Sequence, residues 1–196
     1  MIIFWESNKM KLIKLFAIFV VLLSANISAS NIKESTIDGV KLGMSKEEAI
    51  KALESKYKGV EDYVFVDKGW QFGYFSKQQK QPVIILYTGD FSDEYKTKNV
   101  VIINRRYINT DYKKNSSKID KDKHREFFER TIEQIKLEHG APVDFFIMDS
   151  VVVGRWCNLT KDVTNCSRAP YFMTAEGRLN LNYLELNLTD RTPFNK

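Results

Sequence analysis

Two histidines are the most obvious residues for catalysis or metal binding, and their spacing keeps them apart. His124 and His139 lie 15 positions apart in a stretch with helical periodicity. On one helix this spacing corresponds to about 22 Å, too far for both side chains to hold one metal ion or serve one catalytic centre. The motifs HExxH, GxSxG, GxxxxGK and GxGxxG, typical of metalloproteases, hydrolases and nucleotide-binding proteins, do not occur. We therefore predict a non-enzymatic protein with no catalytic, metal-binding or cofactor-binding residue.

Carboxylates are the remaining candidates for acid–base chemistry. Residues 90–94 (DFSDE) cluster acids between two predicted strands, but they lack the oxygen spacing and central glycine of a calcium loop. We interpret them as a solvated hairpin loop. Carboxylate pairs of the glycosidase type come together only in the folded chain. An envelope hydrolase with an acidic catalytic pair therefore stays open as the alternative function.

The two cysteines predict one structural disulfide. Cys157 and Cys166 have eight residues between them, which is not the CxxC spacing of a redox or zinc site. In an oxidising compartment an isolated pair of this kind is best explained as a clamp on the loop 158–165. Closing a loop of this length stabilises a protein by roughly 2.5 to 3 kcal/mol.

The N-terminus has the pattern of a signal peptide. Three lysines between positions 9 and 14 precede an uncharged run, residues 15–25 (LFAIFVVLLSA), and Ala29 offers a site for cleavage. The run is shorter than the roughly 20 residues that span a bilayer. We predict that residues 1–29 are removed on export and that no membrane span remains, with an uncleaved anchor as the alternative.

Composition favours a globular exported protein over a nucleic-acid-binding one. The chain of 196 residues is 43% apolar and 28% charged, which is ordinary for globular domains. Without residues 1–29 it has 27 basic and 24 acidic residues, a much smaller excess than a nucleic-acid-binding surface carries. Its richness in Lys, Asn and Ile, with so short a signal, favours the periplasm of a Gram-negative bacterium.

A helix followed by four strands is predicted in the first half of the chain. Ser45 and Glu48 form the pattern of a capping box, so a helix begins at Lys46, and Gly59 is placed to end it. The runs that follow are rich in β-branched and aromatic residues, as strands are. They cover residues 63–66, 70–75, 82–87 and 99–108.

The second half repeats this order. A polar, basic stretch leads to a helix that begins at about Asp120 and is stopped by Gly140 and Pro142. Four strand-like runs follow, at residues 143–148, 151–156, 170–174 and 179–188. The apolar residues of the last run change phase at Tyr183, where a β-bulge would restore one buried face.

These elements predict the domain organisation. It comprises a signal peptide (1–29), a first helix-plus-meander unit (30–110), a linker (111–119) and a second unit with the disulfide loop (120–196). The fold class is α+β, with two helix-on-antiparallel-sheet units in tandem, because each small sheet buries one face under its helix.

Aromatic side chains are the candidate binding residues. Trp70, Phe72 and Tyr74 alternate along one strand and so share one face. If the helix covers the opposite face, these three side chains and Trp156 lie on an open sheet surface, where large aromatic residues make strong contacts with partners. The alternative is that the aromatic face is the core face.

A family resemblance rests on the first helix. Residues 39–53, especially residues 42–49 (LGMSKEEA), resemble the helix start of small exported α+β domains of the BamE (SmpA) outer-membrane-assembly family. The same stretch is also similar to the tandem-repeat β-lactamase-inhibitor proteins. Residues 137–142 (LEHGAP) resemble the stop that follows such helices. The resemblance implies binding of another protein rather than catalysis. We therefore expect a periplasmic or secreted protein that binds or inhibits another periplasmic or outer-membrane protein.

Overall fold

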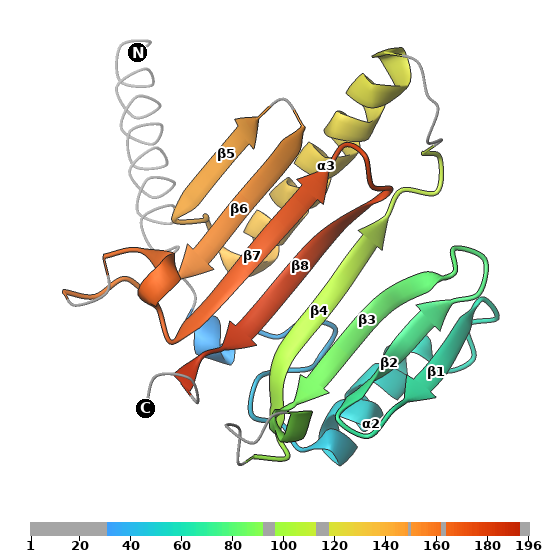
Figure 1. Cartoon of the computed structure of the whole chain (residues 1–196), viewed down its shortest axis with the longest axis vertical. Coiled ribbons are helices and arrows are strands. Elements are labelled where there is room, and N and C mark those ends of the chain that lie inside the picture. The colour runs from blue at the N-terminus through green and yellow to red at the C-terminus, as the bar shows by residue number, and fades with distance from the viewer. Residues whose placement is uncertain (1–30, 92–96, 113–117, 149, 162–163, 193–196) are drawn as a thin grey trace, which may run out of the picture.

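Eight antiparallel strands form one continuous sheet in the order β1-β2-β3-β4-β8-β7-β6-β5 (Figure 1). The computed structural model describes residues 31–91, 97–112, 118–148, 150–161 and 164–192. The predicted signal peptide, residues 1–29, lies outside these ranges. The strands are β1 (Tyr63–Asp67), β2 (Gln71–Ser76), β3 (Gln81–Thr88), β4 (Val100–Ile108), β5 (Asp144–Met148), β6 (Val151–Cys157), β7 (Tyr171–Arg178) and β8 (Tyr183–Asp190).

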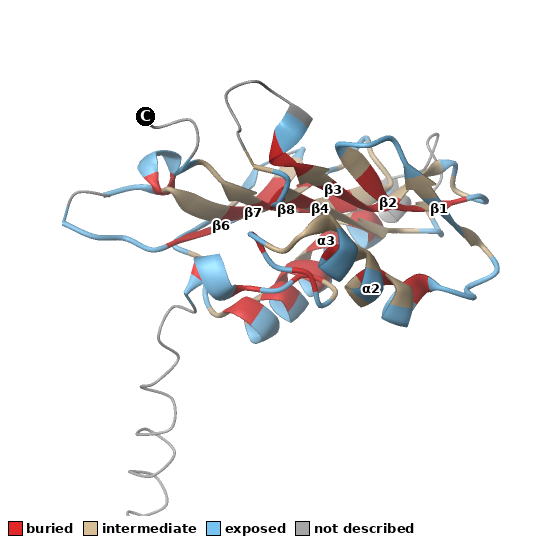
Figure 2. Ribbon diagram, turned by 90° about the horizontal axis from the view of Figure 1, so that it is seen from below, coloured by how far each residue is buried: buried red, intermediate tan, exposed pale blue. Residues whose placement is uncertain are grey.

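Two α-helices pack on the same face of this sheet (Figure 2). The first is α2 (Lys46–Tyr57), and the second is α3 (Lys118–His139), which begins inside the stretch predicted to be a linker. The described residues also contain three single 3-10 turns: η1 (Ile32–Glu34), η2 (Gly89–Phe91) and η3 (Cys166–Arg168). Neither helix, nor any other helix among the described residues, is long and apolar enough to cross a membrane.

The prediction of two helix-on-sheet units in tandem is wrong, because the strands of both halves belong to one sheet. β4 and β8 pair along seven residues, from Ile102 opposite Thr189 to Ile108 opposite Tyr183. The backbone N–H and C=O groups that each set of strands would leave unpaired at this edge are thereby satisfied. One hydrophobic core under the sheet joins α2 and α3, so the halves also share their buried side chains.

The last strand shows which side chains face the helices. Leu184, Leu186 and Leu188 are fully buried in the core, so the alternate residues Tyr183, Glu185 and Asn187 lie on the opposite side. We call that side, which neither α-helix covers, the open face. By register it also includes Tyr87, Arg106, Arg155, Phe172, Thr174, Glu176 and Arg178.

The predicted β-bulge at Tyr183 is absent. β8 begins at Tyr183 and stays in continuous register with both neighbours. The pairing extends to Asp190 opposite Tyr171 of β7 and to Thr189 opposite Ile102 of β4. The phase change in the sequence has a simpler origin, since Leu179 and Leu181 lie in the connection between β7 and β8. The register shifts occur in the other half, at Tyr74 on β2 and Tyr87 on β3.

Candidate functional site

Three of the four predicted partner contacts lie in the core. Phe72 and Tyr74 are buried under α2, and the Tyr74 ring lies 5.2 Å from that of Tyr57. Trp156 is 2% exposed, and its Nε1–H donates to the Gly140 carbonyl, 2.7 Å away. In the folded protein these side chains offer no surface to a partner. The alternative that the sequence left open, an aromatic core face, applies to them.

Trp70 lies apart from this group. It precedes β2 by one residue, so the alternation of side chains along that strand does not fix its direction. It is 42% exposed, and its ring stacks on that of Tyr87 at 5.9 Å. Tyr87 pairs with Ile102, whereas the neighbouring pair of Leu86 and Ile103 is buried toward the helices. Trp70 and Tyr87 therefore form an aromatic corner of the open face.

Polar side chains cross the centre of the open face where β4 meets β8. Arg106 Nε lies 2.9 Å from Glu185 Oε2, and its guanidinium lies 4.3 Å from the centre of the Tyr183 ring. Asn104 donates to Asn187 over 2.7 Å. Burial raises the pKa of Tyr87, Glu185 adds to the rise, and Arg106 opposes it. These groups form one connected polar band beside the aromatic corner.

The disulfide lies at the far end of the open face. Cys157 and Cys166 are bonded, with Cα atoms 5.4 Å apart, which confirms the predicted pair. Both cysteines pack with Ala169 and Phe172 in a small cluster separate from the main core. Beside them is a cavity of about 370 Å³. It is lined by Asp144, Arg155, Asn165, Cys166, Ser167, Phe172, Thr174 and Arg191.

Two arginines of this cavity stack on aromatic rings. The Arg191 guanidinium lies 3.7 Å from the centre of the Phe172 ring, and it donates to the Ser167 carbonyl over 2.7 Å. The Arg155 guanidinium lies 5.2 Å from the centre of the Phe146 ring. Each contact places a flat cation against the face of a ring, a favourable electrostatic arrangement. The cavity therefore has a positive, partly aromatic lining.

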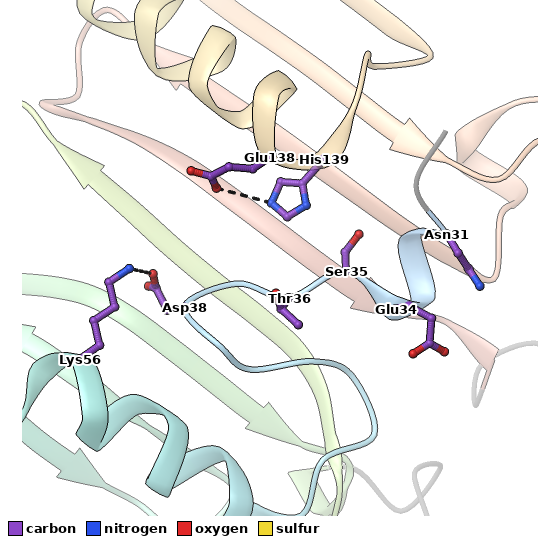
Figure 3. Close-up of a pocket in the computed structure, with 8 residues that line it drawn as sticks. All are labelled: Asn31, Glu34, Ser35, Thr36, Asp38, Lys56, Glu138 and His139. Atoms are coloured by element: carbon purple, nitrogen blue, oxygen red, sulfur yellow. Dashed lines mark hydrogen bonds and ion pairs between the residues drawn. The ribbon is translucent and has the colours of Figure 1, made fainter. Parts of the chain in front are cut away.

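A second cavity, of about 510 Å³, lies on the helix side of the sheet near the end of α3 (Figure 3). Ser35 is 7% exposed, and its hydroxyl has no hydrogen-bond partner among the described residues. His139, the last residue of α3, is buried and also lines the cavity, and burial lowers the pKa of its imidazole. The lining is completed by Asn31, Glu34, Thr36, Asp38, Lys56 and Glu138.

Asp38 in this cavity is fully engaged by structural partners. Its carboxylate accepts hydrogen bonds from Lys56 and from the Tyr57 hydroxyl, and Arg105 Nε lies 2.9 Å from Oδ2. Burial raises the pKa of Tyr57; Arg105 opposes this rise, and Asp38 adds to it. Burial also raises the pKa of Tyr107 to about 12. This cluster ties the N-terminal segment to α2 and β4, so we interpret Asp38 as a structural residue.

The two histidines both lie on α3, as their spacing predicted. His124 is buried, with Nε2 2.6 Å from the Leu181 carbonyl and Nδ1 2.9 Å from the Asn109 amide nitrogen. These partners fit a neutral imidazole that donates from Nε2 and accepts at Nδ1. Burial lowers the pKa of His124, and the bond to Leu181 partly offsets this effect. His124 thus links α3 to the connection between β7 and β8.

Sequence reasoning missed Arg155, Arg191 and their aromatic partners. The alternation of side chains along β6 could have identified Arg155, because it places Arg155 on the face opposite to that of Trp156. On the neighbouring strand β7, Arg155 pairs with Thr174. Within the described ranges no group of three or more His, Cys, Asp or Glu could hold a metal ion. Part of the acidic segment at 90–94 lies outside those ranges.

Comparison with protein-family models, with curated proteins and with solved structures found no significant match. The resemblance to the BamE family and to the tandem β-lactamase inhibitors therefore stays a prediction.

Proposed function

We propose that this chain is an exported, non-enzymatic protein that binds or inhibits another envelope protein through the open face of its sheet. The observation that carries this proposal is the one-sided arrangement of the fold. Both α-helices cover one face, while the other carries the corner of Trp70 and Tyr87 and the ring-stacked Arg106, Arg155 and Arg191. Trp, Tyr and Arg are the residues that most often dominate binding energy at interfaces.

The open face is large enough for a specific interface. Eight strands spaced at about 4.8 Å make a sheet roughly 34 Å across. With strands about 20 Å long the face covers roughly 700 Å², close to the about 800 Å² that each partner contributes to a standard interface. One partner domain could therefore cover the face from the aromatic corner to the disulfide.

Export is part of the proposal. The disulfide between Cys157 and Cys166 suits an oxidising compartment, and the apolar run at residues 15–25 supplies a signal. Intact-mass measurement of the protein recovered from the periplasm or medium should show a chain that lacks residues 1–29. Retention of residues 15–25 in that material would contradict the proposal of a cleaved signal.

The hydrolase alternative finds no support among the described carboxylates. A general acid in a hydrolase needs a carboxyl group whose pKa is raised toward neutrality. Where a carboxyl pKa is shifted in the described residues, it is lowered, in each case mainly by hydrogen bonds: Glu48 bonds to Ser45, Asp62 to Ser76 and Asp67 to Lys46. Binding is therefore the function that we propose.

The test is capture of a partner from envelope extract with matched variants. Trp70→Asp and Tyr183→Asp place a charge on the open face, whereas Leu137→Asp does so on α3, where the side chain is already 88% exposed. A protein captured by the wild type and by Leu137→Asp, but lost with both open-face variants, would support the proposal. Loss of capture with Leu137→Asp alone would place the interface on the helix side and refute it.

A further inference from the structure

The arginines of the disulfide-end cavity differ from the other arginines of the sheet. Arg105 pairs with Asp38, Arg106 with Glu185, and Arg178 with Glu176. Across the ranges that the structure describes, no carboxylate oxygen lies within 4 Å of the side-chain nitrogens of Arg155 or Arg191. Two cations therefore line one cavity on the open face, and neither forms an ion pair with a described carboxylate.

Both guanidinium groups lie over aromatic rings. Phe172 supports Arg191 from one side, and the Ser167 carbonyl accepts one of its five N–H donors. The Arg155 guanidinium lies farther from its ring, 5.2 Å from the centre of Phe146. A guanidinium is planar, and two of its N–H groups can bind a carboxylate with two parallel hydrogen bonds.

We propose that this cavity binds a carboxylate side chain from an acidic segment of the partner protein. The inference rests on the proposed function and names the chemistry of the partner at one end of the open face. Charge complementarity carries it, because the lining has two cations, Arg155 and Arg191, and one anion, Asp144. The Thr174 and Ser167 side chains add neutral hydrogen-bonding groups to the same lining.

Asp144 limits the affinity of the cavity. It is the register partner of Arg155 on β5 and lines the cavity with it. A carboxylate that enters the cavity meets repulsion from Asp144 as well as attraction from the arginines. Removing the charge at position 144 should therefore strengthen binding, while removing either arginine should weaken it. A nonspecific attraction to a basic protein would not distinguish one arginine position from another.

The experiment is an NMR titration of the folded, disulfide-bonded protein with an N-acetylated, C-amidated tetraglutamate peptide. The Nε–Hε signals of Arg155 and Arg191 are followed, and a tetraglutamine peptide measures contacts that do not depend on charge. Arg155→Gln and Arg191→Gln should each weaken binding at least about fivefold, as expected for a charge-assisted hydrogen bond. Asp144→Asn should tighten it. Arg178→Gln is the matched control, because Arg178 lies on the same face of β7, six residues or about 20 Å from Phe172.

The outcomes distinguish a failure of the carboxylate-binding inference from a failure of the proposed function. Saturable shifts that Arg155→Gln weakens and Arg178→Gln leaves unchanged would support the inference. Equal weakening by all the arginine variants, or binding that survives the double variant Arg155→Gln/Arg191→Gln, would overturn it. Capture of the envelope partner tests the two proposals independently. If capture requires Trp70 and Tyr183 but not Arg155 and Arg191, the proposed function stands and the inference about the cavity fails.

Discussion

Gly177 on β7 offers a sharp test of how α3 packs on the sheet. A Cβ added at this position would lie 2.6 Å from Cδ2 and 2.7 Å from Cγ of the Phe128 ring. Carbon atoms in contact are normally about 3.5 to 4.0 Å apart, so the ring would have to move by about 1 Å. Phe128 is fully buried, and the His124 ring lies 4.3 Å away, which leaves it little room.

The expected cost of Gly177→Ala is about 1–3 kcal/mol of the free energy of unfolding, the usual range for overpacking a core. The φ angle of Gly177 is not in the left-handed region, so alanine adds no backbone strain of its own. Urea denaturation measures the loss. Phe128→Leu removes the ring, and in that background Gly177→Ala should cost at least about 1 kcal/mol less than in the wild type.

The double-mutant cycle decides whether the contact exists. If the losses from Gly177→Ala and Phe128→Leu add without coupling, α3 does not lie over β7 as described, and the assignment of the open face falls with it. The control cycle pairs Gly177→Ala with Leu137→Ala, an exposed position on α3. Those two losses should add, because the side chains share no contact.

Three further predictions follow from burial and pairing. Trp156→Ala should lower the free energy of unfolding by about 3–5 kcal/mol, and Trp70→Ala by about 1 kcal/mol or less. Equal losses in urea titrations would contradict a buried Trp156 and a half-exposed Trp70. Replacing Cys157 with Ser should cost about 2.5–3 kcal/mol, and thiol titration of the oxidised, denatured wild type should find no free thiol. Because burial lowers the pKa of His124, the unfolded chain binds a proton first as the pH falls. The free energy of unfolding should therefore decrease from about pH 7.5 to about pH 5, and the decrease should be smaller in His124→Gln; a slope unchanged by that variant would refute the reasoning.

The aromatic strand shows where prediction of the site from the sequence stopped. Alternation correctly grouped Phe72 with Tyr74, but it also placed Trp70 with them, although Trp70 lies just before β2 and turns to the other side. Alternating side chains indicate that the two faces of a strand differ. They do not indicate which face a helix will cover, because the helix and the strand are brought together only by the fold of the whole chain.

Local signals were sufficient for the start of α2, the ends of both helices and the disulfide. Ser45 accepts from the Glu48 N–H while the Glu48 carboxylate accepts from Ser45, so the capping box is confirmed, and α2 begins at Lys46. α3 ends at His139, before Gly140, as predicted. Each of these features depends on residues at most nine positions apart, so the local sequence was sufficient to predict it.

Only the tertiary structure decided how the strands assemble and which residues line the open face. The pairing of β4 with β8 joins residues more than 70 positions apart, and no period in either strand specifies its neighbour. This pairing turned two expected sheets into one. Arg155 and Arg191 likewise lie 36 positions apart on different parts of the chain and meet only because β6, β7 and the end of β8 lie side by side. The sequence by itself determined the elements, since these rest on neighbouring residues, whereas the shared edge and the cavity beside the disulfide rest on contacts between distant ones.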